Sequence, residues 1–270
     1  MTDALVASLG MYDFPWTAGA NDTLWRAIAE RLRHEGVAAP LTLARGADLH
    51  DLWRDPGLIF GQTCGYPYVT ELKGKTAVVA TPAYAFLGCE GASTCSLVIA
   101  PKRLQRRSLA DFNGARAAIN SRDSNSGMNV FRATIAPLAE GRPFFASVLV
   151  TGSHAASLAA VSEGAADIAA IDCVSFALLR RGRPELTARV EAIGRTPSAP
   201  GLPFVMSAAL GERHLEAVRG ALFAALEDPA LAEARATLGL AGAKMLDDAE
   251  YERIADLERE AIALGYPELA

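Results

Sequence analysis

Short apolar runs alternate with amphipathic segments along most of the chain. Apolar runs predict strands at residues 6–11, 40–43, 57–61, 76–81, 96–100, 114–120, 144–151, 167–171, 190–195 and 202–207. Apolar positions spaced by three and four predict helices from about 21 onward, at 47–54, 127–138, 154–162 and 173–180, and in three segments after 207. This alternation predicts an α/β protein with mainly parallel sheets flanked by helices.

Two stretches interrupt this alternation and are typical of crossings between lobes. One lies around residues 100–103, and the other is the Pro-containing stretch 196–201. The block between them contains its own complete set of strands and helices. We therefore predict a discontinuous first lobe of residues 1–100 and 198–270, and an inserted second lobe of residues 101–197. Such lobes would face a ligand cleft at the carboxyl ends of their strands.

The segment NSRDSNSGMN at 120–129 leaves a predicted strand and enters a predicted helix. Exposed backbone N–H groups at a helix start, with hydroxyl donors beside them, bind anions without needing Lys or Arg. This pattern predicts an anion site formed by Ser124, Asn125, Ser126 and Gly127. An ordinary serine cap on a helix explains the same residues.

A second junction of this kind and a strand-end carboxylate add to the candidate site. Ser153 and His154 stand in the first turn of the helix after the strand at 144–151. His154 is either a ligand donor or a capping residue. Asp172 ends the strand at 167–171, where it either caps the next helix or meets a ligand that carries a proton or a cation.

The first lobe offers three candidates for the opposite side of the cleft. Tyr12 follows the first predicted strand, and the segment GQTCGYPY at 61–68 follows the third. Thr63 and Tyr66 in that segment, together with Tyr12, can supply hydroxyl donors. A Gly- and Pro-containing turn with packing tyrosines is the alternative.

Four cysteines are too few for a disulfide scaffold. Cys64 and Cys89 each follow a predicted strand of the first lobe, so we expect a disulfide between them in an oxidising compartment, with buried thiols as the alternative. Cys89 and Cys95 lack CxxC spacing and a nearby histidine, so no metal site is expected. A thiol enzyme would need Cys173 as nucleophile and His154 as base, which we regard as the weaker hypothesis.

Composition excludes two classes of protein. The chain has 26 Lys and Arg against 31 Asp and Glu, a net charge of −5, which gives no basic face for nucleic acid. No apolar run approaches the ~18 residues that span a bilayer. The N-terminus lacks the basic and apolar regions of a secretory leader. We therefore expect a periplasmic protein if a leader was trimmed, and a cytoplasmic one if Met1 is the native start.

Together these segments resemble a known family. The order and spacing of GQTCGYPY (61–68), SLADFNGARAAIN (108–120), DSNSG (123–127), TGSH (151–154), ADIAAIDCV (166–174) and PGLPFV (200–205) resemble the PhnD-like phosphate/phosphonate substrate-binding proteins of the periplasmic binding protein type II superfamily. The resemblance implies a two-lobe clamp whose serine-rich helix start holds phosphoryl oxygens, with Ser153 and His154 in support. Asp172 corresponds to a carboxylate that meets the amine of aminoalkylphosphonates, whereas Asn125 replaces a hydroxyl residue of the family pattern.

From these residues and this resemblance we expect a monomeric binding protein without catalytic activity or cofactor. Its ligand is a small oxyanion (phosphate, a phosphonate or a phosphate ester), and its partner is the permease of an ABC-type uptake system. A cytoplasmic ligand sensor on the same fold is one alternative. An enzyme of the thiamine-precursor type is the other, although four scattered histidines offer it few catalytic groups.

Overall fold

The computed structural model describes residues 4–104 and 108–270, which fold into two compact units. The first unit is formed by Met1–Ala85 and Gly201–Glu250. The second unit is formed by Phe86–Pro200 and Tyr251–Ala270. Each unit has its own five-stranded sheet, so each is described separately below.

The first unit contains a mixed sheet in the order β1-β2-β12-β3-β13. Its strands are β1 (Val6–Ser8), β2 (Leu58–Gln62), β3 (Thr76–Tyr84), β12 (Phe204–Ser207) and β13 (Leu240–Lys244). Only the pair β1–β2 is parallel, while β12 runs antiparallel to both β2 and β3, and β13 runs antiparallel to β3. All five residues of β2 are buried, as expected for a strand covered on both faces.

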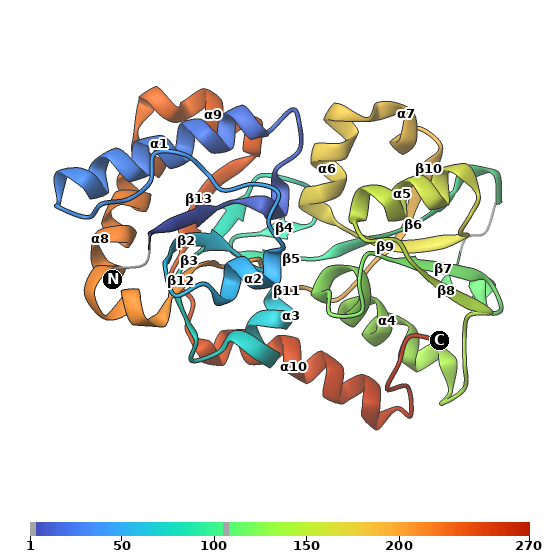
Figure 1. The fold of residues 1–270 in the computed structure, drawn as a ribbon. Helices are drawn as coiled ribbons and strands as arrows, with labels where there is room; N and C mark the ends of the chain where they lie inside the picture. The colour runs from blue at the N-terminus through green and yellow to red at the C-terminus, as the bar shows by residue number, and fades with distance from the viewer. Residues whose placement is uncertain (1–3, 105–107) are drawn as a thin grey trace. The chain divides into compact units, whose positions relative to one another are not determined.

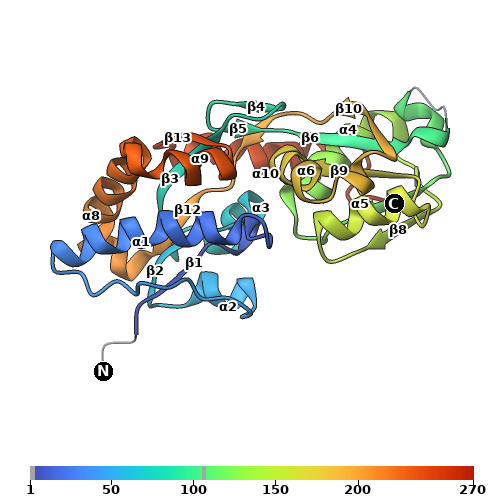
Figure 2. The same cartoon turned by 90° about the horizontal axis from the view of Figure 1, so that it is seen from above.

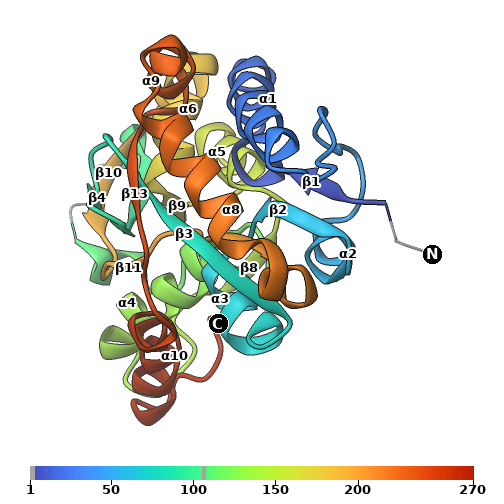
Figure 3. The ribbon, with the colours of Figure 1, turned by 90° about the vertical axis from the view of Figure 1, so that its left-hand side faces the viewer.

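Helices cover this sheet on two sides. They are α1 (Ala18–His34), α2 (Leu49–Arg54), α3 (Gly65–Pro67), α8 (Ala208–Glu227) and α9 (Ala232–Leu238). Helix α8 lies across β3, and α1 packs against α8 and α9 (Figure 3). Figures 1 and 2 show β1 between α1 and α2. The buried residues of α1 recur at helical spacing, in agreement with the apolar spacing that predicted a helix in this region.

The second unit contains a mixed sheet in the order β10-β6-β9-β7-β8, and a small sheet β11-β5-β4. The five main strands are β6 (Ser96–Pro101), β7 (Arg116–Ile119), β8 (Ser147–Val150), β9 (Ile168–Asp172) and β10 (Val190–Arg195). The short ones are β4 (Cys89–Glu90), β5 (Ser93–Thr94) and β11 (Ala199–Pro200). Strands β8, β7 and β9 are parallel neighbours, whereas β6 pairs antiparallel with β9 and β10.

Two groups of helices complete the second unit. They are the π-helical turn η5 (Asn125–Asn129), α4 (Val130–Ala139), α5 (His154–Glu163), α6 (Cys173–Gly182), α7 (Pro184–Thr187) and most of α10 (Asp248–Ala263). Figure 1 shows α5, α6 and α7 above the sheet and α4 below it. Buried Arg132 of α4 donates to the carbonyl of Pro267 and to Asn129 Oδ1, at 2.6 and 2.8 Å. The C-terminal segment is thereby tied to the helix that follows the serine-rich loop.

The structure corrects the predicted sheets and lobe boundaries. The sheets are mixed rather than mainly parallel, because β6, β10, β12 and β13 all pair antiparallel. Residues 86–100 lie in the second unit rather than in residues 1–100 of a first lobe, since β6 is hydrogen-bonded between β9 and β10. Residues 251–270, which we expected in the first lobe with 198–270, also belong to the second unit.

Two local predictions were also wrong, and one strand was missed. Residues 40–43 form no strand, although the neighbouring Ala44 N–H donates to the Ala7 carbonyl. Helix α1 begins at Ala18 rather than at about residue 21, and Asn21 lies inside it and donates to Asp13. The three helical segments predicted after residue 207 are α8, α9 and α10, but β13 between α9 and α10 was not predicted; Gly239 ends α9 in a left-handed conformation with φ of 69°.

Candidate functional site

Three polar segments of the second unit come from adjacent strands. The serine-rich loop follows β7, the TGSH loop follows β8, and Asp172 is the last residue of β9. Because these three strands are parallel neighbours, their carboxyl ends lie at one edge of the sheet. The fold therefore places seven of the predicted site residues at one edge: Ser124, Asn125, Ser126, Gly127, Ser153, His154 and Asp172.

Ser124 and Ser126 have different tasks in the serine-rich loop. Ser124 is the N-cap residue of η5, and its buried Oγ accepts a hydrogen bond from the Gly127 N–H at 3.0 Å. Ser126 Oγ lies 2.8 Å from His154 Nε2, which joins the serine-rich loop to the start of α5. The carbonyl of Ser126 accepts from Ser96 Oγ at 2.7 Å. Ser126 is thus held both through its hydroxyl and through its carbonyl.

Gly127 is required by close packing rather than by its backbone angles. A Cβ atom at this position would lie 1.9 Å from Asn120 Oδ1 and 3.2 Å from His154 Cε1. Both distances are too short for any side chain unless the neighbours move. The glycine therefore allows Asn120 and His154 to approach the start of η5.

His154 is held in an uncharged state. Its Nδ1 atom is buried and has no hydrogen-bond partner, while Nε2 contacts Ser126. Burial lowers the pKa of the His154 imidazole, and the nearby carboxylate of Asp172 only partly opposes this shift. A neutral ring at this helix start is consistent with the positive end of the α5 dipole.

Asp172 caps a helix and keeps one oxygen unsatisfied. The residue is 2% exposed, and its Oδ2 accepts from the Ser175 N–H at 2.7 Å, so the predicted capping role is confirmed. Its Oδ1 is buried and has no partner. Asp172 pairs with Ser96 of β6, whose hydroxyl reaches Ser126, so the carboxylate and the serine-rich loop share a neighbour.

Asn125 and Ser153 take part mainly in local structure. The amide oxygen of Asn125 accepts from Asn129 Nδ2 at 3.1 Å inside the turn. The Ser153 Oγ accepts from the Ala156 N–H at 3.1 Å and caps α5 at the surface. A contact of either side chain with a ligand stays a prediction.

Two site residues were not predicted. Ser96 stands at the start of the apolar run SLVIA, and Asn120 ends the run before the serine-rich loop. A polar residue at the end of an apolar run was the available signal, but only the sheet register shows that Ser96 faces Asp172. Asn120 Oδ1 is a third buried polar atom without a partner, after His154 Nδ1 and Asp172 Oδ1.

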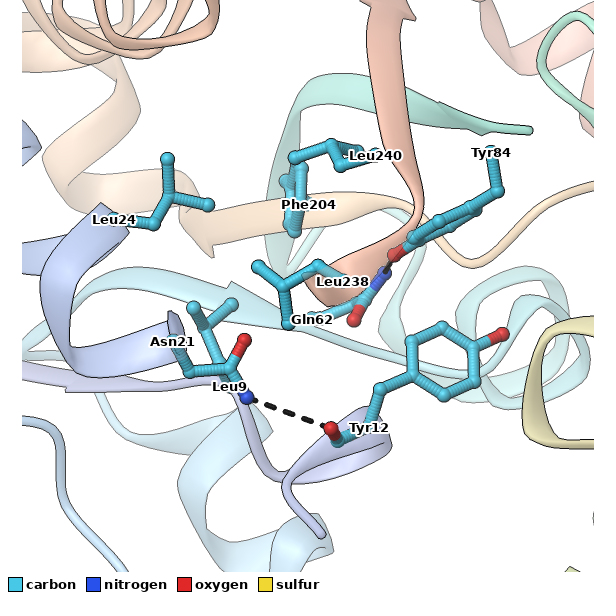
Figure 4. A pocket seen from close by; sticks show the side chains of 9 residues that line it. All are labelled: Leu9, Tyr12, Asn21, Leu24, Gln62, Tyr84, Phe204, Leu238 and Leu240. Carbon is cyan, nitrogen blue, oxygen red and sulfur yellow. Dashed lines mark hydrogen bonds between the residues drawn. The ribbon is translucent and has the colours of Figure 1, made fainter. Parts of the chain in front are cut away.

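The first-unit candidates lie in different surroundings. Tyr12 lines a small cavity of about 20 Å³, and its ring meets that of Tyr84 edge to face at 5.5 Å (Figure 4). The cavity has room for one water molecule but not for a phosphonate. Gln62 in its wall donates to Tyr84 and to the carbonyl of Leu202, at 3.2 and 3.1 Å.

Thr63 and Tyr66 lie just beyond β2. Thr63 is fully buried, and its N–H donates to the carbonyl of Pro203 at 3.1 Å. Tyr66 is half-buried, and its carbonyl accepts from Thr70 Oγ1. A ligand contact by Tyr12, Thr63 or Tyr66 stays a prediction.

The expected disulfide between Cys64 and Cys89 is not formed. Both residues are thiols, and they belong to different units. The sulfur of Cys89 instead lies 3.4 Å from the sulfur of Cys173. The prediction assigned Cys89 to the first lobe, whereas the β4–β5 hairpin that begins with Cys89 belongs to the second unit.

Two negative findings concern the described ranges 4–104 and 108–270. Within them, no group of three or more His, Cys, Asp or Glu side chains is arranged to hold a metal ion. None of the helices in these ranges combines the length and apolarity that crossing a bilayer requires.

The two α/β units have the fold of type II periplasmic binding proteins, with which the chain aligns over nearly its full length. Residues 59–251 match the family described as "ABC transporter, phosphonate, periplasmic substrate-binding protein", and the match covers more than two thirds of the chain. The protein therefore belongs to this family of substrate-binding proteins. No match was found among curated proteins.

Solved structures with this fold share little sequence with the chain. A binding protein component of an ABC phosphonate transporter from Pseudomonas aeruginosa is 18% identical, with a TM-score of 0.75, covering 97% of this chain and 89% of that one. PhnD1 from Prochlorococcus marinus, in complex with methylphosphonate, is 16% identical with a TM-score of 0.73, covering 95% and 97%. An ATP-bound protein from Xanthomonas citri is 17% identical with a TM-score of 0.72, covering 97% and 98%.

Proposed function

We propose that the second unit binds a small phosphoryl oxyanion that carries at least one proton, such as a phosphonate monoanion. The observation that carries the proposal is the contact between Ser126 Oγ and His154 Nε2. Three buried polar atoms near this contact lack hydrogen-bond partners: His154 Nδ1, Asn120 Oδ1 and Asp172 Oδ1. Buried polar atoms in native proteins are nearly always satisfied by protein, water or ligand. We take the unsatisfied atoms as ligand contacts.

The donors of this site are neutral. The N–H groups at the start of η5 and the Ser126 hydroxyl can donate to phosphoryl oxygens, and the dipole of the helix favours an anion there. His154 adds no positive charge, because burial lowers its pKa. Affinity therefore comes from oriented hydrogen bonds rather than from an ion pair.

The acceptors select the protonation state of the ligand. Asn120 Oδ1 and Asp172 Oδ1 can only accept hydrogen bonds from a ligand, and both are buried. A phosphonate monoanion has a P–OH group that donates to such an oxygen, and an aminoalkylphosphonate has an ammonium group that also does. Sulfate at neutral pH has neither, so it leaves these acceptors unsatisfied. Asp172 also disfavours a fully charged anion by repulsion.

The biological role follows the family. We propose a binding protein without catalytic activity that works outside the cytoplasm and delivers its ligand to an ABC permease. Membership of the periplasmic substrate-binding family supports this role. Methylphosphonate in the PhnD1 complex supports a phosphonate as the first ligand to test.

Isothermal titration calorimetry of the full chain tests the proposal with methylphosphonate, phosphate and sulfate at neutral pH. We expect micromolar or tighter binding of methylphosphonate, and at least about 100-fold weaker binding of sulfate, because unpaired buried groups are costly. Ser126→Ala should weaken methylphosphonate binding by roughly 10-fold or more.

Thr23→Ala is the matched control for the loss of a hydroxyl. Thr23 lies at an exposed position of α1 in the first unit, and its Oγ1 donates to the Gly19 carbonyl, so ligand affinity should not change. Equal affinity for sulfate and methylphosphonate, or full affinity in Ser126→Ala, would contradict the proposed site.

A further inference from the structure

Three of the four cysteines gather around Gly88 in the second unit. Cys89 Sγ lies 3.4 Å from Cys173 Sγ. A Cβ atom on Gly88 would lie 2.9 Å from Cys173 Cβ and 3.0 Å from Cys95 Sγ, so the third sulfur borders the same glycine. Gly88 has φ of 98°, a conformation that only glycine adopts readily. The turn before Cys89 is thus shaped to bring the three sulfurs together.

Backbone hydrogen bonds hold the segments that carry these thiols. The Cys95 N–H donates to the Gly88 carbonyl at 3.0 Å, and the Cys173 N–H donates to the Cys95 carbonyl at 3.1 Å. Cys173 is the first residue of α6, and Cys89 begins β4. The cluster is therefore part of the folded framework and does not depend on side-chain conformation alone.

The thiols differ in acidity and in access to solvent. Hydrogen bonding with the Cys173 thiol lowers the pKa of Cys95 to about 7 and also lowers the pKa of Cys89. The same hydrogen bonds, together with burial, raise the pKa of Cys173. Cys89 is half-buried, whereas Cys95 and Cys173 are buried. Cys89 therefore combines a lowered pKa with the best access for a reagent.

We propose that Cys89 and Cys173 are a redox-active pair that forms a disulfide by exchange with a small-molecule disulfide. Cys95 remains a thiol at the edge of the pair. The bond would join the β4–β5 hairpin to the start of α6, next to Asp172.

The exchange is balanced with oxidised glutathione as the oxidant. The Cys89 thiolate attacks one glutathione sulfur, which forms a mixed disulfide and releases the other glutathione as a thiolate. Cys173 loses its proton, and its sulfur attacks the Cys89 sulfur and displaces the second glutathione. Two protein thiols are oxidised, one glutathione disulfide is reduced to two thiols, and the two protons end on glutathione.

The test uses the full chain, fully reduced and then equilibrated with oxidised glutathione. Thiol titration under denaturing conditions should fall from four thiols to two. Mass spectrometry of a non-reducing digest should find the peptide of Cys89 linked to that of Cys173. The unfolding temperature should rise by roughly 10 °C on oxidation, because the bond closes a long loop of the unfolded chain.

Variants distinguish this pair from the other thiols. Each single variant begins with three thiols. Cys89→Ser should still show three thiols after oxidation, whereas Cys95→Ala and Cys64→Ser should each lose two. Half-buried Cys89 tolerates a serine, and circular dichroism of the reduced variants checks the fold. Four titratable thiols after oxidation, a glutathione adduct without a crosslink, or a crosslink that excludes Cys173 would each overturn the proposal.

Discussion

The Oγ atom of Ser126 lies 2.8 Å from Nε2 of His154, although 28 residues separate them in the chain. The contact connects the loop after β7 to the loop after β8, so two helix starts with unsatisfied N–H groups share one hydrogen bond. Neither residue is charged in this arrangement, since burial keeps the imidazole neutral.

Gly127→Ala tests the close approach of Asn120 and His154. The added methyl group would lie 1.9 Å from Asn120 Oδ1, so the loop must move. We expect a loss of about 1–3 kcal/mol in the free energy of unfolding, measured by urea denaturation, and a large loss of methylphosphonate affinity. Gly220→Ala at an exposed position of α8 meets no atom within 4 Å and should instead stabilise the protein by about 0.5–1 kcal/mol. Similar effects of the two substitutions would contradict this packing.

The lowered pKa of His154 predicts a pH dependence of stability. In the unfolded chain the imidazole titrates near 6.5, while burial lowers its pKa in the folded protein. The unfolded state therefore binds more protons below pH 6.5, and stability is lost as the pH falls from there through the folded pKa. Urea denaturation at pH 7.5 and pH 5.5 should show a smaller loss in His154→Gln than in the wild type.

The same substitution at exposed His34 is the control for this measurement. His34→Gln should keep the full pH dependence of the wild type. If both variants lose stability between the two pH values as the wild type does, burial of His154 does not contribute.

Asp172→Asn tests how the ligand's proton is recognised. Asparagine can still cap α6 through its amide oxygen, so the fold should be retained. In the wild type we expect methylphosphonate affinity to fall as pH rises through the second ionisation of the ligand, because the P–OH donor is lost beside a carboxylate. Calorimetry across this range should give a flatter profile for the variant. If affinity falls equally steeply with pH in both proteins, Asp172 does not recognise the proton of the ligand.

Arg132→Met tests the link between α4 and the C-terminal segment. Arg132 is buried, donates to Pro267 and Asn129, and lies 3.2 Å from Glu258. Its removal leaves these acceptors without their donor, so we expect a loss of about 3–5 kcal/mol in the free energy of unfolding. Arg142→Met removes an exposed ion pair with Glu140 and should change stability by less than about 1 kcal/mol. Urea denaturation of both variants measures these changes in the free energy of unfolding.

Part of the candidate site was predictable because it depends on local sequence. The N-cap of Ser124 and that of Ser153 follow from serine before a helical pattern, and the cap of Asp172 follows from its place after an apolar run. The alternation of strands and helices brought the three loops to the ends of neighbouring strands. These inferences need only short-range preferences and the general rule for parallel strands.

Other parts depended on pairings that no local pattern contains. Ser96 reaches the site because β6 runs antiparallel to β9, a choice that the apolar run SLVIA does not reveal. The partner of Cys89 was mispredicted for the same reason, since the hairpin containing Cys89 belongs to the second unit. The antiparallel β13 was missed because its Ala- and Gly-containing sequence has weak strand preference.

The sequence by itself determined the α/β class, the serine-rich helix starts and the resemblance to phosphonate-binding proteins, because hydrophobic periodicity and helix caps are local properties. Only the tertiary structure decided which residues meet: Ser126 with His154, Asn120 with Gly127, and Cys89 with Cys173. Strand order and register bring these distant residues together, and both are set by packing of the whole unit rather than by any one segment.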